Sequence, residues 1–368
     1  MNTAPYKAVS LFSGAGGMDV GFSNAGVSIE VANEIDHEAS KTYRLNHQGK
    51  LLEGNIRDYV DHLKLYRGID LVFGGPPCQG FSVAGKMNPN DERSALIHTY
   101  FDVVDEIKPR AFICENVKAL ATLSKWAAVR SELINRASKS YSTALIILNS
   151  SEFGVPQNRE RMFLVGFNKD EINVSESVLS NWLSNELAKL QEKPPTIRDI
   201  VCKLGRAGSL SNKRICKARI TFAKSPVLRN SPYAGMLFNG AGRPLSPDGR
   251  SSTLPASMGG NKTPIVDESA IFDGSESFIE RYHLHLTRGG KPRSGDAPSH
   301  LRRLTIDECV AIQTFPPNYV FAGSQSSVFR QIGNAVPCKL AEAVARAAIN
   351  ILEADEHQIP ITDLIAAE

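Results

Sequence analysis

The stretch Asp70-Leu71-Val72-Phe73-Gly74-Gly75-Pro76-Pro77-Cys78-Gln79-Gly80-Phe81-Ser82 places a cysteine behind an apolar run, two glycines and two prolines. Residues 70–73 are typical of a short buried strand, so Cys78 lies at the strand's carboxyl end, where open α/β sheets bind their ligands. Proline restricts φ and has no amide donor, while glycine lets another molecule approach the backbone. This composition favours a rigid loop that presents a nucleophile. The alternative is a structural cysteine, because a free cysteine is often a small core residue.

The composition is that of an ordinary globular chain, with 368 residues, a formal net charge of +3 and 42% hydrophobic residues. This length allows a large core and predicts two domains. The six cysteines show neither metal-ligand spacing nor a dense disulfide pattern, so we expect reduced thiols and no bound metal. The first residues lack a signal peptide, and no run approaches the roughly 18 apolar residues of a membrane span. We therefore expect a cytoplasmic protein that does not enter a membrane.

A glycine-rich turn, Ser13-Gly14-Ala15-Gly16-Gly17, follows the strand predicted over residues 8–12 and precedes a helical pattern. This order is typical of a nucleotide-type cofactor site. The dehydrogenase fingerprint fails because its third glycine would fall at Asp19, which favours an adenosyl group without phosphates. Glu34 lies twenty residues after Gly14, behind a second strand-like run, and its carboxylate can accept hydrogen bonds from both ribose hydroxyls. A plain tight turn is the alternative.

Helices and short apolar strands then alternate along the chain. The patterns predict helices over 59–66, 94–107 and 125–137 and strands over 70–73, 111–114 and 142–148. This alternation predicts an α/β fold with a doubly wound, mostly parallel sheet.

Two further polar groups follow predicted strands. The strand at 111–114 delivers Glu115 to the same sheet edge as Cys78, although a carboxylate there could equally cap the next helix. Arg159, Arg161 and Phe163 alternate along a strand, so we expect the two arginines to share one face. A solvated edge is the alternative for this arginine pair.

Taken together, the motifs resemble those of C5-cytosine-specific DNA methyltransferases of the bacterial restriction-modification type. The ordered motifs are Phe12-Ser13-Gly14-Ala15-Gly16-Gly17, Pro76-Pro77-Cys78-Gln79, Glu115-Asn116-Val117, Gln157-Asn158-Arg159-Glu160-Arg161, Arg303-Leu304-Thr305 with Glu308-Cys309, and Gln331-Ile332-Gly333-Asn334-Ala335-Val336-Pro337. They extend from residue 8 to about residue 345. One position departs from the family, since Asn55 stands in Gly54-Asn55-Ile56 where an aspartate is usual. Its side-chain oxygen can still accept a hydrogen bond from the adenine amino group.

The resemblance implies a mechanism and a catalytic set. The thiolate of Cys78 adds to cytosine C6, because a thiolate both attacks strongly and leaves again. Glu115 acts as the acid at N3, and Arg159 and Arg161 steady the cytosine O2 and the catalytic groups. The activated C5 then takes a methyl group from S-adenosylmethionine. No residue stands out as the base for the C5 proton.

The resemblance also implies the cofactor contacts. These residues are Phe12, Ser13, Gly14, Ala15, Gly16, Gly17, Glu34, Ile35, Asn55, Ile56, Pro76, Asn334, Ala335 and Val336. Because a stacked cytosine is out of reach, the family resemblance further implies base flipping from double-stranded DNA. Residues 80–90 have the composition of a loop that closes over DNA, with a plain connector as the alternative.

Past residue 170, Pro194-Pro195 and several later Ser-Pro and Arg-Pro pairs interrupt the alternation. Residues 191–303 carry 19 Lys and Arg against 9 Asp and Glu, a net charge of +10 that leaves −7 elsewhere. Such a concentration of positive charge favours a polyanionic partner. We predict a catalytic domain over 1–180 and 325–356, a loop-rich target-recognition domain over 181–324, and a tail over 357–368. A helix over 338–352 should return to the first domain's sheet.

The sequence thus predicts a monomeric DNA (cytosine-5) methyltransferase that protects DNA from a cognate restriction endonuclease or acts without one. Two alternatives stay open. One is an RNA methyltransferase on the same scaffold, against which the long basic segment argues. The other is a DNA-binding relative without activity, against which the intact Cys78, Glu115, Arg159 and Arg161 argue.

Overall fold

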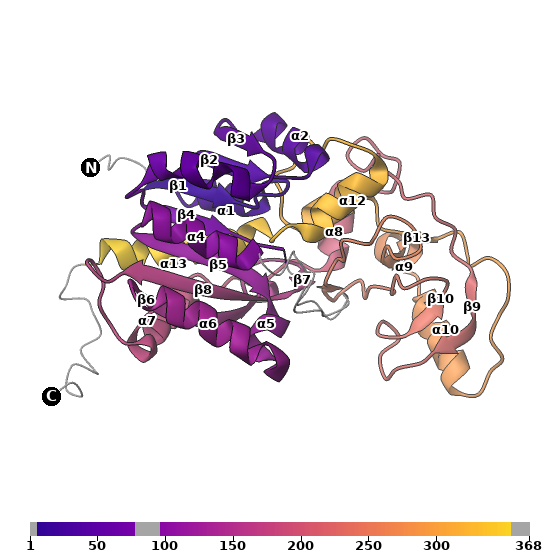
Figure 1. Cartoon of the computed structure of the whole chain (residues 1–368). Coiled ribbons are helices and arrows are strands. Elements are labelled where there is room, and N and C mark those ends of the chain that lie inside the picture. Colours follow the sequence, from indigo (N-terminus) through magenta and orange to yellow (C-terminus); the bar gives the residue numbers. More distant parts are fainter. Residues whose placement is uncertain (1–5, 78–95, 355–368) are drawn as a thin grey trace. The chain divides into compact units, whose positions relative to one another are not determined.

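The computed structural model describes residues 6–77 and 96–354, which form two compact units (Figure 1). Within these ranges, the first unit comprises the chain up to Phe153, Glu160–Glu192 and the chain from Pro337 onward. The second unit comprises Gly154–Arg159 and Lys193–Val336. Cys78, the loop predicted over 80–90 and the tail predicted over 357–368 lie outside the described residues. The predicted functional domains stay a prediction.

The first unit is built on a seven-stranded sheet with the order β3-β2-β1-β4-β5-β8-β6. Every neighbouring pair is parallel except those of β8, which runs antiparallel to both β5 and β6. This confirms the predicted α/β class with a mostly parallel sheet. The strands are β1 (Tyr6–Leu11), β2 (Val27–Glu34), β3 (Lys50–Glu53), β4 (Leu71–Gly74), β5 (Ala111–Val117), β6 (Tyr141–Asn149) and β8 (Glu160–Asn168).

The helices of the first unit follow from the strand connections. From β1 the chain crosses toward β2, whereas from β4 it crosses toward β5 in the opposite direction along the sheet. Right-handed crossovers in opposite directions place their helices on opposite faces, which makes the sheet doubly wound. The helices are α1 (Gly17–Asn24), α2 (His37–Asn46), η1 (Ile56–Tyr59), α3 (Val60–Leu63), η2 (Lys64–Tyr66), α4 (Leu96–Ile107), α5 (Lys118–Thr122), η3 (Ser124–Trp126), α6 (Ala127–Ala137), η4 (Ser150–Glu152), α7 (Glu176–Lys189) and α13 (Cys338–Glu353).

The last helix, α13, returns to the first unit as predicted and packs against α1 and α7. Its apolar stripe is fully buried, from Leu340 through Val344 to Ile351. Gly21 of α1 allows this close contact, because a Cβ at this position would lie 2.4 Å from the carbonyl oxygen of Cys338. On the other face, α4 packs against α3 and α6 over a core that contains Tyr100, Phe101 and Phe112.

The doubly wound topology locates the site. The strand order reverses between β1 and β4, and ligands of such sheets bind outside the carboxyl ends of the strands at that point. The glycine-rich turn follows β1, and the Gly75-Pro76-Pro77 loop follows β4. Both predicted motifs therefore lie at this switch point.

The second unit has short strands that pair two by two. The strands β7 (Gln157–Asn158) and β11 (Ser251–Ser252) are parallel, whereas β9 (Phe222–Val227) with β10 (Met236–Phe238) and β12 (Ile265–Asp267) with β13 (Leu301–Arg303) are antiparallel. Its helices are α8 (Ile197–Leu204), α9 (Glu268–Phe272), α10 (Phe278–Thr287), α11 (Ile306–Ile312) and α12 (Gln325–Asn334). An aromatic cluster of Phe222, Phe238, Phe278 and Tyr282 joins α10 to β9 and β10.

Candidate active site

The glycine-rich turn has an unusual backbone. Phe12, Gly14 and Gly16 all have positive φ, at 54°, 56° and 83°. Glycine adopts such angles readily, but a bulky residue such as Phe12 does so rarely and at a cost. Strain of this kind is typical of functional sites, where the surrounding structure must hold it in place.

Glu34 makes several of the contacts that keep the turn in this shape. The residue is buried at the end of β2, and its Oε2 atom accepts a hydrogen bond from the Gly14 amide at 2.7 Å. Its Oε1 atom accepts from the amides of Ile35 at 2.9 Å and Asp36 at 2.6 Å. Burial raises the pKa of Glu34, and these three backbone donors oppose that effect. Glu34 thus links the turn to the start of α2, a role that the sequence alone did not predict.

The groups around this turn fit an adenosyl cofactor. The backbone amides occupy three of the roughly four acceptor sites of this carboxylate, so Oε2 has room for one further donor, which suits a ribose hydroxyl. Ile35 is 66% exposed directly beside Glu34, so an apolar side chain is available to a purine ring. Asn55 accepts from the Arg57 amide at 3.2 Å as the N-cap of η1, and Ile56 is buried behind it.

The loop after β4 is held by β1 and β5. Gly74 pairs with Leu11 of β1, and a Cβ there would lie 2.1 Å from the Leu11 carbonyl oxygen. The side-chain amide of Asn116 donates to the carbonyl oxygen of Pro76 at 3.2 Å. The Asn116 side chain thus anchors the loop that leads to Cys78, and its place in the Glu115-Asn116-Val117 motif is explained.

Glu115 lies near the carboxyl end of β5 and forms an ion pair across the sheet. Arg161 of β8 stands opposite Val117, so its side chain reaches Glu115 diagonally. The Arg161 Nε atom lies 2.9 Å from Glu115 Oε1, and the two side chains are only 14% and 11% exposed. The other oxygen, Oε2, faces the loop, since a Cβ on Gly75 would lie 2.8 Å from it. Arg161 therefore orients a carboxyl group toward the loop that carries the predicted nucleophile.

Arg159 has different surroundings from Arg161, and the expectation that both share one face of a strand is wrong. Strand β8 begins at Glu160, and Arg159 precedes it as part of the second unit. Its buried guanidinium donates to the carbonyl oxygens of Leu254 at 3.2 Å and Gly333 at 2.9 Å, and to that of Asn334 at 3.4 Å. Arg159 thus joins the end of α12 to the segment after β11.

Asn334, Ala335 and Val336 lie at the end of α12 in the second unit. Asn334 is exposed, and Gln313 donates from its side chain to the carbonyl oxygen of Ala335 at 3.1 Å. Gln157 donates in turn to Gln313 at 2.8 Å. This network fixes residues 331–336 within the second unit, and the predicted cofactor contacts of Asn334, Ala335 and Val336 stay predictions.

A buried arginine also organises the glycine-rich loops of the second unit. Arg303 of β13 donates to the Thr263 carbonyl oxygen at 2.7 Å and to the Asn239 carbonyl and side-chain oxygens at 3.1 Å each. Its Nε atom has no hydrogen-bond partner within the described residues, and burial lowers the pKa of its guanidinium. Arg303 thus clamps the loop that begins at Gly240 to the loop that ends at Thr263.

The described cysteines do not suit a nucleophilic role. Burial raises the pKa of the Cys114, Cys309 and Cys338 thiols well above its usual value, which keeps them protonated. Cys202 is exposed on α8, and it is far in the sequence from the motifs that lie at the switch point. Within the described ranges no group of His, Cys, Asp and Glu side chains is arranged to hold a metal ion. The same ranges contain no helix long and apolar enough to cross a membrane.

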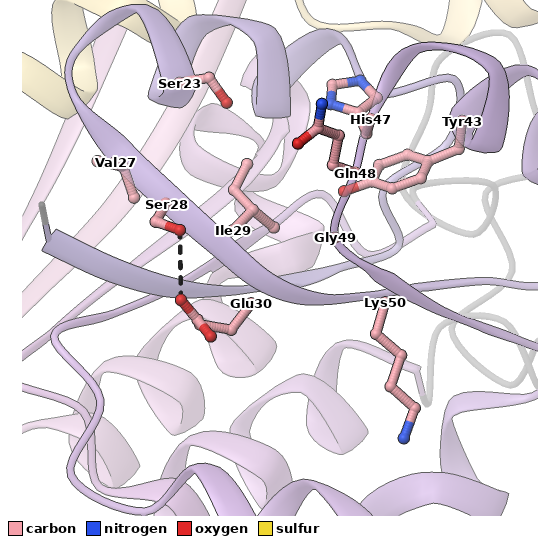
Figure 2. Close-up of a pocket in the computed structure, with 10 residues that line it drawn as sticks. All are labelled: Ser23, Val27, Ser28, Ile29, Glu30, Tyr43, His47, Gln48, Gly49 and Lys50. Carbon is pink, nitrogen blue, oxygen red and sulfur yellow. Dashed lines mark hydrogen bonds between the residues drawn. The ribbon is translucent and has the colours of Figure 1, made fainter.

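A separate cavity of the first unit lies at the opposite edge of the sheet. Figure 2 shows this cavity of about 440 Å³, which is lined by the first residues of β2, the start of β3 and the side chains of Tyr43 and His47. Because these are the amino ends of the strands, the cavity is distinct from the glycine-rich turn. Burial lowers the pKa of His47 to about 4.

Comparison with known proteins identifies the class. The chain has the fold of S-adenosylmethionine-dependent methyltransferases: the S. pombe Dnmt2 methyltransferase matches over 95% of this chain and 100% of its own, with a TM-score of 0.65 and 18% identity. The Entamoeba histolytica methyltransferase EhMeth matches over 96% of this chain and 100% of its own, with a TM-score of 0.64 and 17% identity.

The family follows from the sequence comparisons. The family model for C-5 cytosine-specific DNA methylase matches residues 6–350, and the chain belongs to this family. The Type II methyltransferase M.FnuDI of Fusobacterium nucleatum is 32% identical over 346 residues, which are 92% of this chain and 93% of that protein. The Type II methyltransferase M.HindV of Haemophilus influenzae is 32% identical over 348 residues, or 94% and 96% of the two chains. The predicted family and enzyme class are confirmed.

Proposed function

We propose that this chain methylates C5 of a cytosine within a specific sequence of double-stranded DNA, with S-adenosylmethionine as the methyl donor. The observation that carries the proposal is the Glu115–Arg161 ion pair, in which the second carboxyl oxygen, Oε2, faces the loop leading to Cys78. A buried acid held toward a loop with a nucleophile is the arrangement that activation of a cytosine requires. The turn held by Glu34 would bind the cofactor at the same switch point.

Each residue has a defined task in this scheme. The Cys78 thiolate forms a bond to C6 of the flipped cytosine, and Glu115 gives a proton to N3 so that negative charge does not build up in the ring. Arg161 holds Glu115 in place throughout. Bound S-adenosylmethionine supplies an electrophilic methyl group, which C5 accepts. Loss of the C5 proton to a base, departure of the Cys78 sulfur and return of the N3 proton to Glu115 restore the aromatic ring and the enzyme.

Arg159 has a supporting role in this proposal. Its guanidinium would also steady the cytosine O2, while its three carbonyl contacts hold the segment around it. Asn334, Ala335 and Val336 would complete the cofactor site.

We assign DNA recognition to the second unit because of its charge. The segment 191–303 has a net charge of +10, and neutralisation of phosphates supplies most of the affinity of proteins for DNA. One exposed face of α10 carries Arg281, His285 and Arg288 around a hollow of about 420 Å³. The enzyme would act in the cytoplasm as a monomer and protect DNA from a cognate restriction endonuclease.

Trapping with 5-fluorocytosine tests the catalytic scheme. Fluorine at C5 blocks the final proton loss, so Cys78 should stay bonded to the target base after methyl transfer. The adduct should survive denaturation, require S-adenosylmethionine and map to Cys78. Cys78→Ser should abolish it because a serine hydroxyl supplies almost no anion near neutral pH, and Glu115→Gln should slow it strongly.

Two controls complete the test. An enzyme that methylates ordinary DNA but gives no adduct, or an adduct at another cysteine, would contradict the role of Cys78. Competition between duplex DNA and transfer RNA as methyl acceptors separates the proposed substrate from RNA. Sequencing of methylated bases in DNA from expressing cells would define the target sequence.

A further inference from the structure

Asp19 is a buried acid that the proposed chemistry does not use. It is the third residue of α1, directly after the glycine-rich turn, and its side chain is fully buried. The Tyr43 hydroxyl of α2 donates to Asp19 Oδ1 at 2.9 Å, whereas Oδ2 has no partner at hydrogen-bond distance within the described residues, although the Ser10 hydroxyl of β1 is near enough to lower the pKa of this carboxyl. Burying a carboxyl group with so few partners is costly, so this position needs an explanation.

The Tyr43–Asp19 bond closes a ring of contacts around the turn. On one side, Glu34 connects the Gly14 amide to the amide of Asp36, which is the N-cap of α2. On the other side, Tyr43, two turns further along α2, connects that helix to Asp19 in the first turn of α1. The turn is therefore attached to one helix at both of its ends.

The second attachment acts where the turn passes into α1. Gly16, the N-cap of α1, has a φ of 83° and makes no side-chain capping bond. The backbone bonds from Ser13 to Asn33 and from Gly16 to Ser13 hold the first half of the turn, and the Val20 amide donates to the Gly16 carbonyl oxygen at 2.9 Å. Strained residues such as Phe12 persist only when their surroundings hold them from several sides.

Tyr43 is itself well placed as a fixed anchor. Its ring stacks on His47 with 4.3 Å between the centroids, and both side chains line the cavity at the amino edge of the sheet, as Figure 2 shows. Removing only its hydroxyl would leave this ring stack in place. The hydroxyl can therefore be tested without disturbing the packing of α2.

We propose that Tyr43 and Asp19 are positioning residues that hold the second half of the glycine-rich turn in the shape that binds S-adenosylmethionine. This inference rests on the proposed cofactor. Neither residue is assigned a contact with the cofactor; they act through the turn and through the first residues of α1.

The test compares Tyr43→Phe with a matched control, Tyr100→Phe. The Tyr100 hydroxyl is buried in the same unit and donates to the Val72 carbonyl oxygen at 3.2 Å, so its loss also removes one buried hydrogen bond. Calorimetry with S-adenosylmethionine and thermal unfolding without it are measured for both variants. Tyr43→Phe should weaken cofactor binding by about tenfold, which corresponds to about 1.4 kcal/mol. Tyr100→Phe should lower the melting temperature similarly and leave binding unchanged.

Steady-state kinetics and a conservative variant sharpen the result. Tyr43→Phe should raise KM for S-adenosylmethionine with little change in kcat, because the turn binds the cofactor and does not touch the reacting cytosine. Asp19→Asn keeps the acceptor for Tyr43 and should bind nearly as the wild type does, whereas Asp19→Ala should match Tyr43→Phe.

The outcomes separate two failures. If wild-type protein does not bind S-adenosylmethionine, the proposed function fails. If the wild type binds but Tyr43→Phe binds equally well, or if both tyrosine variants lose affinity in parallel with stability, the positioning role is overturned.

Discussion

Replacing Asp19 with asparagine should make the free energy of unfolding less sensitive to rising pH. Burial raises the pKa of Asp19 from 3.8 to about 7 in the folded chain. Between these values the folded state retains a proton that the unfolded state has released, so wild-type stability falls as the pH rises from about 4 to about 7. Asparagine has nearly the same shape, accepts the Tyr43 hydrogen bond and does not titrate.

The size of the effect follows from the two pKa values. The difference between these pKa values limits the stability advantage of Asp19→Asn over the wild type to about 4 kcal/mol at pH 8. Relaxation of the folded chain would reduce this value. Below pH 4 the effect should vanish, because Asp19 is then protonated in both states. The groups that face Asp19 are Ser10 on β1, Glu34 on β2, Tyr43 on α2 and Cys338 on α13, and they are the same in both proteins.

Urea unfolding of wild type and Asp19→Asn at pH 5, 6, 7 and 8 measures this difference directly. The stability advantage of the variant should grow with each step up to pH 7 and then level off. Asp248→Asn is a suitable control. The hydrogen bond from Arg198 lowers the pKa of the exposed Asp248 carboxyl, so any change that this substitution makes in the pH dependence of stability should occur below pH 5. An advantage that is constant or shrinks from pH 5 to pH 8 would refute the assignment of a raised pKa to Asp19.

Three further results are expected. Glu34→Ala should weaken S-adenosylmethionine binding by about 1.5–3 kcal/mol, the range for hydrogen bonds to a charged group, and unchanged affinity by calorimetry would remove Glu34 from the site. Gly75→Ala should reduce kcat strongly with little loss of secondary structure by circular dichroism, because its Cβ would lie 2.8 Å from Glu115 Oε2; an unchanged kcat would contradict the orientation of Glu115 toward the loop. Arg281→Ala with Arg288→Ala should reduce the slope of DNA affinity against salt by about one for each phosphate that the variant no longer neutralises. The control, Lys139→Ala with Lys169→Ala on the first unit, should leave this slope unchanged. Equal slope changes for the two double variants in a binding titration would contradict the assignment of DNA binding to the second unit.

Much of the first unit could be predicted from the sequence because its strands are short apolar runs separated by helical patterns. The antiparallel direction of β8 could not, since an apolar run fixes burial and not direction. The helix predicted over 59–66 is instead η1, α3 and η2, and it ends before Gly68, whose φ is 77°. A local pattern of periodicity does not distinguish an α-helix from a chain of shorter turns.

The site residues that belong to contiguous motifs could be predicted from the sequence. The contacts between residues far apart in the sequence could not. Glu115 and Arg161 were identified from their motifs, but their ion pair depends on the register between β5 and β8. Arg159 was expected on the same face as Arg161, and alternation failed there because the strand begins one residue later. The Tyr43–Asp19 bond could not be predicted, because it joins residues 24 positions apart on two different helices and no local sequence pattern marks the pair.

Arg303 has a consequence for how a protein of this kind could change its specificity. Its hydrogen bonds to the two glycine-rich loops are made chiefly to the backbone carbonyls of Thr263 and Asn239. Such bonds do not depend on the side chains of residues 240–243 or 257–262. Substitutions of the non-glycine residues in these loops would therefore alter the surface of the proposed DNA-recognition unit without releasing the loops from their anchor. A Cβ on Gly242, in contrast, would lie 2.6 Å from Arg303 Nη1 and would disturb that anchor. Divergence in target sequence would then require only exchanges of exposed side chains, with the supporting framework inherited intact.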